Sequence, residues 1–438
     1  MTTCLNRERK VQGSVLLIAM GVTFVLGLGL ASYLTLTRTQ HVSVVRSQAW
    51  NAAMGLAEAG VEEAMAQLNP GAQVFVTNNN QIIDRGVNGW SLLSDGMYHA
   101  PRRALSQGYY DVAMTPDKFP VIYATGYVTI PALSTTVSRA IRATTANNSL
   151  FRGAMVAIDT IDFKGNGVET DSFDSTDPNY NTGGLYDKAK RKAGGDVAST
   201  EGIINVQNAN IMGTLYTGPD GSYKVGNGSV GDVAWVVGKN IGLQDGHYKN
   251  DFNLDIPPIL PPYETAIPPD NQGTTNTWYL LDRDYMVTDS KGAEFMTGKT
   301  IFVAGNARVY VTGNFIMHGG SSIIIAPGAS LELYVGGAET TITTLNNAGN
   351  CASFSYFGLP GNTSVSVSGN NLILGTIYAP SAFLKLSGSG APTIPIDFQG
   401  ACVVQTIQMN GHFNYHFDEN LRKSAPVGLY QLTSWREI

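Results

Sequence analysis

The amino-terminal part of the sequence constrains the fold most. A basic cluster of Arg7, Arg9 and Lys10 precedes an apolar run from Ser14 to Leu36, and no charged residue follows before Arg38. At about 1.5 Å per residue the run forms roughly 34 Å of helix, enough to cross a bilayer core of about 30 Å. The basic residues predict that this end stays in the cytoplasm and that the rest lies outside. A secretory signal peptide has a shorter apolar region, of about 7–15 residues.

The same helix is predicted to continue beyond the apolar run. The segment from Thr39 to Leu68 contains no proline, and Asn69-Pro70-Gly71 ends it. Its apolar side chains recur three or four residues apart along one stripe, at Val42, Val45, Ala49, Ala52, Leu56 and Ala59. We therefore predict a basic leader at 1–13 and one long helix at 14–69, half of it in a membrane and half projecting from it.

Three motifs in this helix carry a family resemblance. They are Gln12–Leu17 (QGSVLL), Arg46–Ala53 (RSQAWNAA) and Ala57–Ala64 (AEAGVEEA). Together they resemble the amino-terminal helix of type IV pilin-like proteins, and specifically of the PilX-like pilus-assembly minor pilins. The resemblance implies that a prepilin peptidase cuts after Gly13 and that Ser14 becomes a methylated first residue.

One position departs from the pilin pattern. Ordinary pilins carry Glu at the fifth mature position, where this chain has Ile18. In this respect the chain is similar to the minor pseudopilins placed at a filament tip, where no earlier subunit's amine needs a partner. The alternatives are inefficient cleavage, which leaves the helix as a permanent anchor, and an ordinary single-span anchor.

The rest of the chain is predicted to be mainly β. Only 14% of the residues are charged and 49 of 438 are glycine, whereas about a quarter and roughly 7% are typical. Strand-like runs between Pro and Gly predict a small β-rich neck at 70–148. From Phe151 onward, short apolar bursts are broken by Gly or Asn, as in the rungs of a β-helix or solenoid. No strict period is evident, and a β-sandwich or jelly roll is the alternative.

A proline-rich stretch divides this body. The segment 256–270 contains six prolines, so we predict an extended connection that crosses the solenoid face or joins two β blocks. The first solenoid block is then 149–255, and the second block with its carboxyl-terminal cap is 271–438. The cap resembles the terminal module of PilX-like proteins through the motifs Gly375–Pro380, Asp397–Ala401 and Asn410–Glu419.

The charge balance argues against a nucleic-acid binder. Lys and Arg number 28 and Asp and Glu 34, giving a net charge of −6, so no basic footprint for phosphates is present. The segment Gly292–Thr300 looks like a phosphate loop. It has five residues between its glycines instead of four, and a strand instead of a helix is predicted to follow. A surface turn explains it better.

Two groups of residues are candidate metal ligands. Asp171, Asp174 and Asp177 lie in a stretch rich in Ser and Asn, whose oxygens suit Ca²⁺, although the spacing is not that of the helix–loop–helix calcium motif. A solvated turn held by side chain–backbone hydrogen bonds is the favoured alternative. His412 and His416 lie in a strand-like pattern, which would put them about 13 Å apart, too far for one ion.

No catalytic residue is predicted, and the segment Asp282–Asp284 is the nearest approach to a pair of catalytic acids. On a strand their carboxylates share one face about 7 Å apart, which suits the paired acids of β-helical polysaccharide-cleaving enzymes. A salt-linked surface strand is the simpler explanation. Cys351 and Cys402 could form one extracytoplasmic disulfide or remain two buried thiols.

These observations predict a minor pilin-like or pseudopilin-like cell-surface structural protein, not an enzyme. The predicted partners are other pilin-like subunits, bound through the helix, the inner membrane and a prepilin peptidase. The chain would cross the inner membrane once and carry an extracytoplasmic solenoid head for pilus assembly or adhesion. No cofactor is predicted beyond the calcium considered above. The alternative is a membrane-tethered β-helical carbohydrate-active enzyme.

Overall fold

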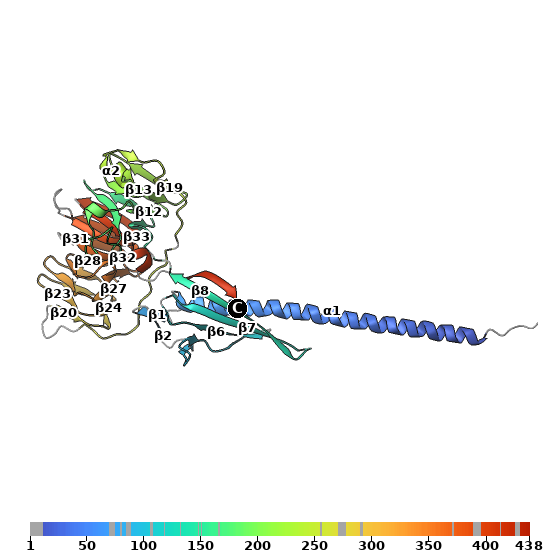
Figure 1. Ribbon diagram of the computed structural model, residues 1–438. Coiled ribbons are helices and arrows are strands. Elements are labelled where there is room, and N and C mark those ends of the chain that lie inside the picture. The colour runs from blue at the N-terminus through green and yellow to red at the C-terminus, as the bar shows by residue number, and fades with distance from the viewer. Residues whose placement is uncertain are drawn as a thin grey trace, which may run out of the picture. The chain divides into compact units, whose positions relative to one another are not determined.

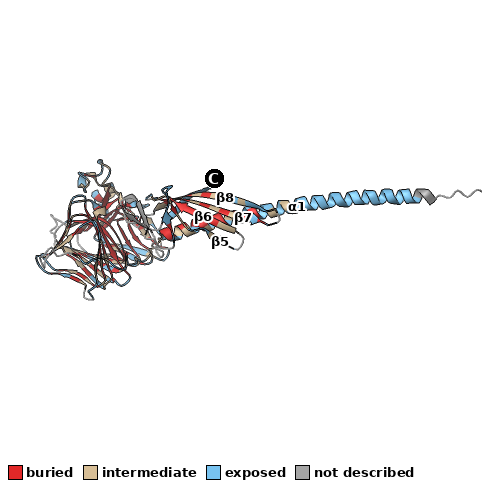
Figure 2. Cartoon of the chain, turned by 90° about the horizontal axis from the view of Figure 1, so that it is seen from below, coloured by how far each residue is buried: buried red, intermediate tan, exposed pale blue. Residues whose placement is uncertain are grey.

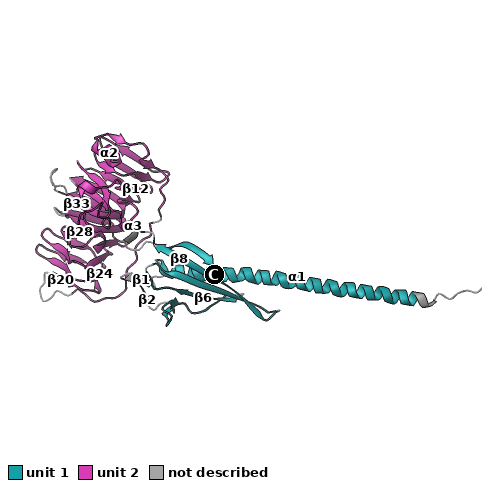
Figure 3. Ribbon diagram, viewed as in Figure 1, with its two compact units in different colours: residues 1–146, 431–438 teal, residues 147–430 magenta. Residues whose placement is uncertain are grey.

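The chain is mainly β with one long amino-terminal helix, as predicted (Figure 1). The computed structural model describes residues 12–69, 75–78, 81–84, 89–105, 108–117, 119–131, 133–147, 149, 151–164, 167–254, 256–269, 277–289, 292–369, 372–388, 396–411, 413–424 and 430–438. It forms two compact units, one made of 1–146 with 431–438 and the other of 147–430 (Figure 3).

Helix α1 spans Gln12–Leu68, 57 residues, as one element. Between Val15 and Leu36 every large apolar side chain is at least 52% exposed (Figure 2). The second half instead buries a stripe of small and apolar side chains spaced three or four residues apart: Ala49, Ala53, Leu56, Ala57, Val61, Ala64 and Leu68. The helix is therefore apolar and exposed at its beginning and amphipathic at its end.

The first unit is an antiparallel sheet covered by the second half of α1. Its centre is the meander β6 (Gly108–Met114), β7 (Val121–Ile130) and β8 (Thr135–Asn147). Strands β3 (Ser91–Leu92), β4 (Tyr98–His99) and β5 (Arg103–Leu105) extend it on the β6 side, and β1 (Phe75–Asn78) and β2 (Gln81–Asp84) form a separate hairpin. Alternate residues of β7, among them Ile122, Ala124 and Val128, are buried, which is the period expected of a strand with one covered face.

The last strand departs from the predicted domain boundaries. Strand β35 (Tyr430–Glu437), expected within the cap of 271–438, joins the first unit beside β8. The amide of Ile438 donates to the carbonyl of Ala140 at 3.0 Å, and Arg139 forms an ion pair with Glu437 at 2.5 Å. Strand β35 pairs with the otherwise open edge of β8, although the two strands lie almost three hundred residues apart in the sequence. The second unit is thus inserted between two strands of the first.

The second unit is a parallel β-solenoid. On one face the inward side chains Tyr285, Val309, Leu333, Tyr356, Ile377 and Cys402 lie in register. Successive members are 24, 24, 23, 21 and 25 residues apart in the chain. A repeat is therefore present, and its variable corners explain why no strict period is visible in the sequence.

Three faces make up the solenoid, and their strands have the following bounds. The first face holds β21 (Asp284–Val287), β24 (Asn306–Val311), β27 (Ser330–Val335), β30 (Phe354–Gly358), β32 (Ile373–Gly388), β33 (Ile396–Gly411), β9 (Met155–Ala157), β12 (Val197–Ser199), β15 (Leu215–Thr217) and β19 (Tyr248–Lys249). The second holds β22 (Ala293–Phe295), β25 (Phe315–Met317), β28 (Glu339–Ile342), β31 (Ser364–Gly369), the later halves of β32 and β33, β10 (Ile161–Phe163), β13 (Ile203–Gln207) and β16 (Ser222–Val225). The third holds β20 (Thr277–Leu280), β23 (Thr300–Val303), β26 (Ser322–Ile325) and β29 (Leu345–Asn347), and then the start of β33 with β34 (Phe413–Asp418), β11 (Glu169–Phe173), β14 (Asn210–Met212), β17 (Ser229–Gly231) and β18 (Gly242–Leu243). Short helices α2 (Val233–Val237) and α3 (Leu421–Ser424) complete the unit.

The two predicted solenoid blocks form one continuous stack whose chain order is rearranged. Strands β33 and β34, late in the chain, pair in parallel with β9, β10 and β11, early in the unit. The early block ends at β19 and the late block starts at β20, at opposite ends of the stack. After β19 the chain therefore runs to the other end of the solenoid. The strands from β20 onward then build the stack from that end toward its middle.

The proline-rich segment makes that passage along the first face. We call residues 256–269 the strap. The hydroxyl of Tyr378 donates to the carbonyl of Pro257 at 2.7 Å, Tyr263 donates to the carbonyl of Tyr285 at 2.5 Å, and the amide of Met286 donates to Ile267 at 2.9 Å. Few backbone donors are available to the strap, so tyrosine side chains of the solenoid and the strap supply much of the contact.

Candidate assembly helix and buried polar clusters

The second half of α1 lies in backbone contact with the sheet. A Cβ atom built on Gly126 of β7 would be 2.1 Å from the carbonyl oxygen of Ala53 and 2.7 Å from the amide nitrogen of Ala57. On the helix, a Cβ atom at Gly60 would be 3.0 Å from the Cβ atom of Ala124. Only a hydrogen atom fits at position 126, because real Cβ contacts are far longer than 2.1 Å.

A half-buried polar cluster fixes how the helix lies on the sheet. The carboxylate of Glu63 accepts hydrogen bonds from Nε and Nη2 of Arg103, at 3.1 and 3.0 Å, and from the hydroxyl of Tyr110 at 2.7 Å. Burial, and then the hydrogen bond to Glu63, raises the pKa of Tyr110 to about 12. Three donor atoms from two side chains bind one carboxylate, which holds α1 in a single register against β5 and β6.

The first half of α1 is long and apolar enough to cross a membrane, and none of its most apolar stretch is buried. Gly13 and Ser14, the predicted processing residues, lie in the first turn of the helix, whereas residues 1–11 of the predicted leader lie outside the described residues. Ile18, in place of the usual pilin glutamate, is 64% exposed. This half of the helix offers an apolar surface on every side and no buried contact within the described chain.

The three predicted calcium ligands have separate roles. Asp171 is fully buried, with Oδ1 2.5 Å from Nδ1 of His416, and its Oδ2 accepts a hydrogen bond from Tyr186 at 2.6 Å. Asp174 accepts from the amide of Thr176 at 2.9 Å, and Asp177 accepts from the amide of Asn179 at 3.0 Å. Among the described residues, no group of three or more His, Cys, Asp or Glu could hold a metal ion. The three carboxylates therefore do not point to one shared ion position. Asp174 and Asp177 instead accept hydrogen bonds from backbone amides two residues on, as in a turn.

His416 is the centre of a buried ionic cluster that sequence reasoning missed. It is 2% exposed, and the ring of Tyr186 stacks on its imidazole with centroids 3.5 Å apart. Its Nε2 atom lies 3.6 Å from Oδ1 of Asp397. Burial alone would lower the pKa of His416, but the charge of Asp171, followed by Asp397, outweighs burial and raises the pKa to about 9. His416 is thus a cation held between two acids at neutral pH. Its predicted neighbour His412 lies outside the described residues.

Of the predicted acid pair, Asp284 begins β21 and Asp282 lies in the bend before it, and both carboxylates make structural contacts. Oδ1 of Asp282 accepts from the amide of Asn306 at 2.7 Å. Both oxygens of Asp284 accept from Arg308, at 2.7 and 2.6 Å. Arg308 lies under the strap, with its guanidinium 5.6 Å from the ring of Tyr263. This is the salt-linked strand that the sequence offered as the simpler explanation.

The remaining sequence candidates take structural positions. Cys351 and Cys402 are both free and buried, so they form no disulfide with each other. Burial raises the pKa of the Cys402 thiol to about 12 and that of Cys351 well above its usual value, which makes both thiols poor nucleophiles. In the phosphate-loop-like segment, Gly292 adopts a φ of 83° before β22, and strand β23 follows instead of a helix.

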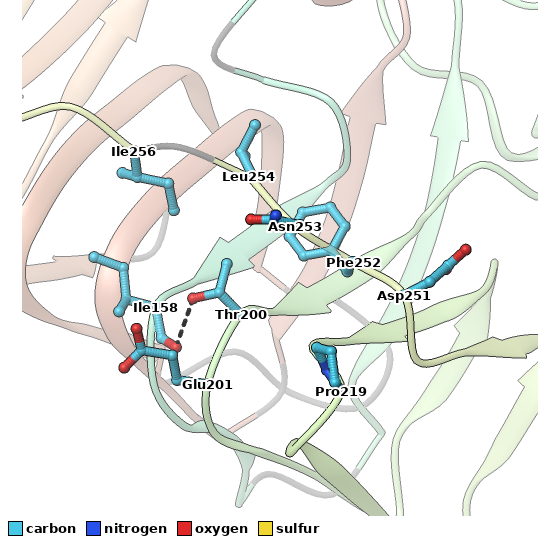
Figure 4. Close-up of a pocket in the computed structure, with 9 residues that line it drawn as sticks. All are labelled: Ile158, Thr200, Glu201, Pro219, Asp251, Phe252, Asn253, Leu254 and Ile256. Carbon is cyan, nitrogen blue, oxygen red and sulfur yellow. Dashed lines mark hydrogen bonds between the residues drawn. The ribbon is translucent and has the colours of Figure 1, made fainter.

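A cavity of about 470 Å³ lies where the chain approaches the strap (Figure 4). Its lining residues are Ile158, Thr200, Glu201, Pro219, Asp251, Phe252, Asn253, Leu254 and Ile256. The hydroxyl of Thr200 donates to the carbonyl of Ile158 at 3.0 Å. The described lining residues combine apolar side chains with two exposed carboxylates and include no histidine, lysine or arginine.

Comparison with known proteins gives limited results. A family model described as a domain of unknown function (DUF7305) matches residues 225–424. No curated protein sequence matches the chain. Among solved structures, the competence-associated pilin ComZ from Thermus thermophilus is 11% identical, with 89% of this chain and 98% of that chain covered and a TM-score of 0.24. The DUF3494 domain of an ice-binding protein from Shewanella frigidimarina is also 11% identical, with 62% and 99% covered and a TM-score of 0.20. Scores this low carry no argument about function.

Proposed function

We propose that this chain is a minor pilin-like or pseudopilin-like structural protein of the cell surface. Its N-terminal helix anchors it in the inner membrane and later packs among the helices of other pilin-like subunits. The solenoid projects as a non-catalytic head for pilus assembly or adhesion. A prepilin peptidase acting after Gly13 releases the subunit for assembly.

The division of α1 carries this proposal. One helix presents an exposed apolar surface from Val15 to Leu36 and then packs on its own sheet from Ala49 to Leu68. A plain anchor needs only the first part, since about 20 apolar residues span a bilayer. A rigid continuation fixed by Glu63 and Gly126 is what a subunit needs if its anchor is to set the position of its folded unit among neighbouring helices.

The structural role of the head is supported by its polar clusters. Asp284, which is paired with Arg308, and Asp171, which is paired with His416, form internal contacts and do not face a shared substrate site. The carbohydrate-active alternative would need a free acid pair, and Asp282 and Asp284 do not provide one.

Mass spectrometry of the mature amino terminus tests the proposal. We expect a chain produced together with a prepilin peptidase to begin at Ser14 and to carry one methyl group there. The matched control replaces Gly13 with leucine, which should leave the precursor intact. An intact Met1 in cells that process an ordinary pilin would instead identify a plain membrane anchor.

A further inference from the structure

We propose that the first unit binds a second copy of this chain through charge. Arg142 and Arg436, on the face of the sheet away from α1, would receive Glu58 and Glu62 of the other copy's helix. The inference rests on the proposed function, which places several copies side by side in one membrane.

The two arginines lie side by side on the uncovered face. In the register of β7 and β8, Tyr123 is opposite Arg142. The neighbours of Tyr123 in β7, Ile122 and Ala124, are buried on the helix side, so Tyr123 and Arg142 point the other way. The hydrogen bond from the Ile438 amide to the Ala140 carbonyl sets the antiparallel pairing of β8 and β35. Counting two residues along each strand places Arg436 directly opposite Arg142.

This arginine pair has no counterion among the described residues. Three arginines between residues 89 and 147 are paired: Arg102 with Asp111 at 2.7 Å, Arg103 with Glu63 at 3.0 Å and Arg139 with Glu437 at 2.5 Å. Neither Arg142 nor Arg436 makes a hydrogen bond or ion pair within the part of the chain that the structure describes. Like charges directly opposite on adjacent strands destabilise a sheet. The isolated unit therefore carries an unfavourable pair that an acidic partner would relieve.

The helix carries the complementary arrangement. Glu58 and Glu62 are exposed and lie one turn apart on α1, and the charge of Glu58 also acts on Arg139 of β8. Neither makes a hydrogen bond or ion pair with a described residue, whereas Glu63 is bound to Arg103. Like charges four residues apart also destabilise a helix. Gly55 lies beside them with nothing within 4 Å of its Cβ position, so the helix backbone there is open to close approach.

The two pairs match in sign, number and spacing. Side chains four residues apart on a helix are separated by about 5–6 Å at Cβ, and directly opposite residues on adjacent strands by about 4.5–5.5 Å. Each guanidinium can bind one carboxylate with two parallel hydrogen bonds, and long arginine stems accommodate different crossing angles. Because the helix side of one copy binds the sheet side of the next, the contact is heterologous and can propagate along a filament.

Energy transfer between donor-labelled and acceptor-labelled full chains, reconstituted in zwitterionic lipid vesicles, tests this pairing. We expect E58K/E62K and R142E/R436E each to weaken association about tenfold. Mixing the two variants should restore it, because lysines on one copy then meet glutamates on the other. The control E201K/D220K makes the same charge change on exposed residues of the second unit and should associate like the unaltered chain.

The outcomes separate this inference from the proposed function. Unaltered association in both variants, or no recovery on mixing, overturns the pairing. Association that requires anionic lipid and survives E58K/E62K identifies a lipid partner and also overturns it. The amino-terminal mass is measured on the same preparations. If the chain is processed at Ser14 but does not associate, the proposed pairing is wrong and the proposed function stands. If an unprocessed chain associates, the proposed processing is wrong and the pairing stands.

Discussion

Replacing Gly126 with valine is expected to separate α1 from its sheet. The first carbon of any side chain would lie 2.1 Å from the Ala53 carbonyl oxygen and 2.7 Å from the Ala57 amide nitrogen. Both atoms belong to helix backbone, which cannot move aside as a flexible side chain can. Overpacking of this kind costs about 3 kcal/mol, at the upper end of its usual range. Denaturant unfolding of the full chain in detergent, followed by circular dichroism, measures the loss.

Gly55 provides the matched control for this substitution. It lies in the same helix, with nothing within 4 Å of its Cβ position. Alanine there should stabilise the helix by up to about 1 kcal/mol, because glycine disfavours a helix interior. If G126V unfolds at the same denaturant concentration as the unaltered chain, the helix does not pack on β7 as described.

Replacing His416 with glutamine is expected to destabilise the solenoid strongly. Asp171 is fully buried and would lose the imidazole that contacts its Oδ1 atom. Removing one partner of a buried ion pair typically costs about 3–5 kcal/mol. The control D174N alters a half-buried turn carboxylate and should cost far less, about 1 kcal/mol, because only turn hydrogen bonds weaken.

The pH dependence of this loss has a definite sign. The pKa of His416 is raised from 6.5 to about 9 in the folded chain, so folding favours its protonated form. That stabilisation, roughly 3 kcal/mol, is complete below pH 6.5 and disappears as the pH rises through about 9. The unaltered chain should therefore lose unfolding free energy between these values, and H416Q should show a much flatter profile. Equal slopes in both proteins would show that His416 is not a buried cation.

The elements encoded by local pattern could be predicted from the sequence. Helix α1 follows from an uninterrupted apolar run, a stripe of period 3.6 and the stop at Asn69-Pro70-Gly71. The solenoid class follows from short apolar bursts, because each rung needs only a few inward side chains. The strap follows from its prolines, which cannot take part in a central strand.

Arrangements that depend on distant residues could not be predicted. The pairing of β33 with β9 joins Cys402 to Met155, and nothing in either segment marks the other. Asp171 and His416 are 245 residues apart in the sequence. The local spacing of Asp171, Asp174 and Asp177 made calcium binding a candidate, but it could not show that Asp171 pairs with a distant histidine. Strand β35 shows the same limit, since its place is decided by the free edge of β8.

A spin-label scan along α1 tests the central claim most directly. Single labels are placed from position 15 to position 68 in the full chain, with Cys4 replaced by serine, in lipid vesicles, and their exposure to oxygen and to a water-soluble nickel complex is measured. We predict oxygen access throughout 15–36, nickel access from Arg38 to Gln48, and then alternating protection with a helical period from Ala49 to Leu68. Nickel access throughout 15–36, or loss of the helical period near Arg38, would contradict one continuous helix shared between the membrane and the sheet.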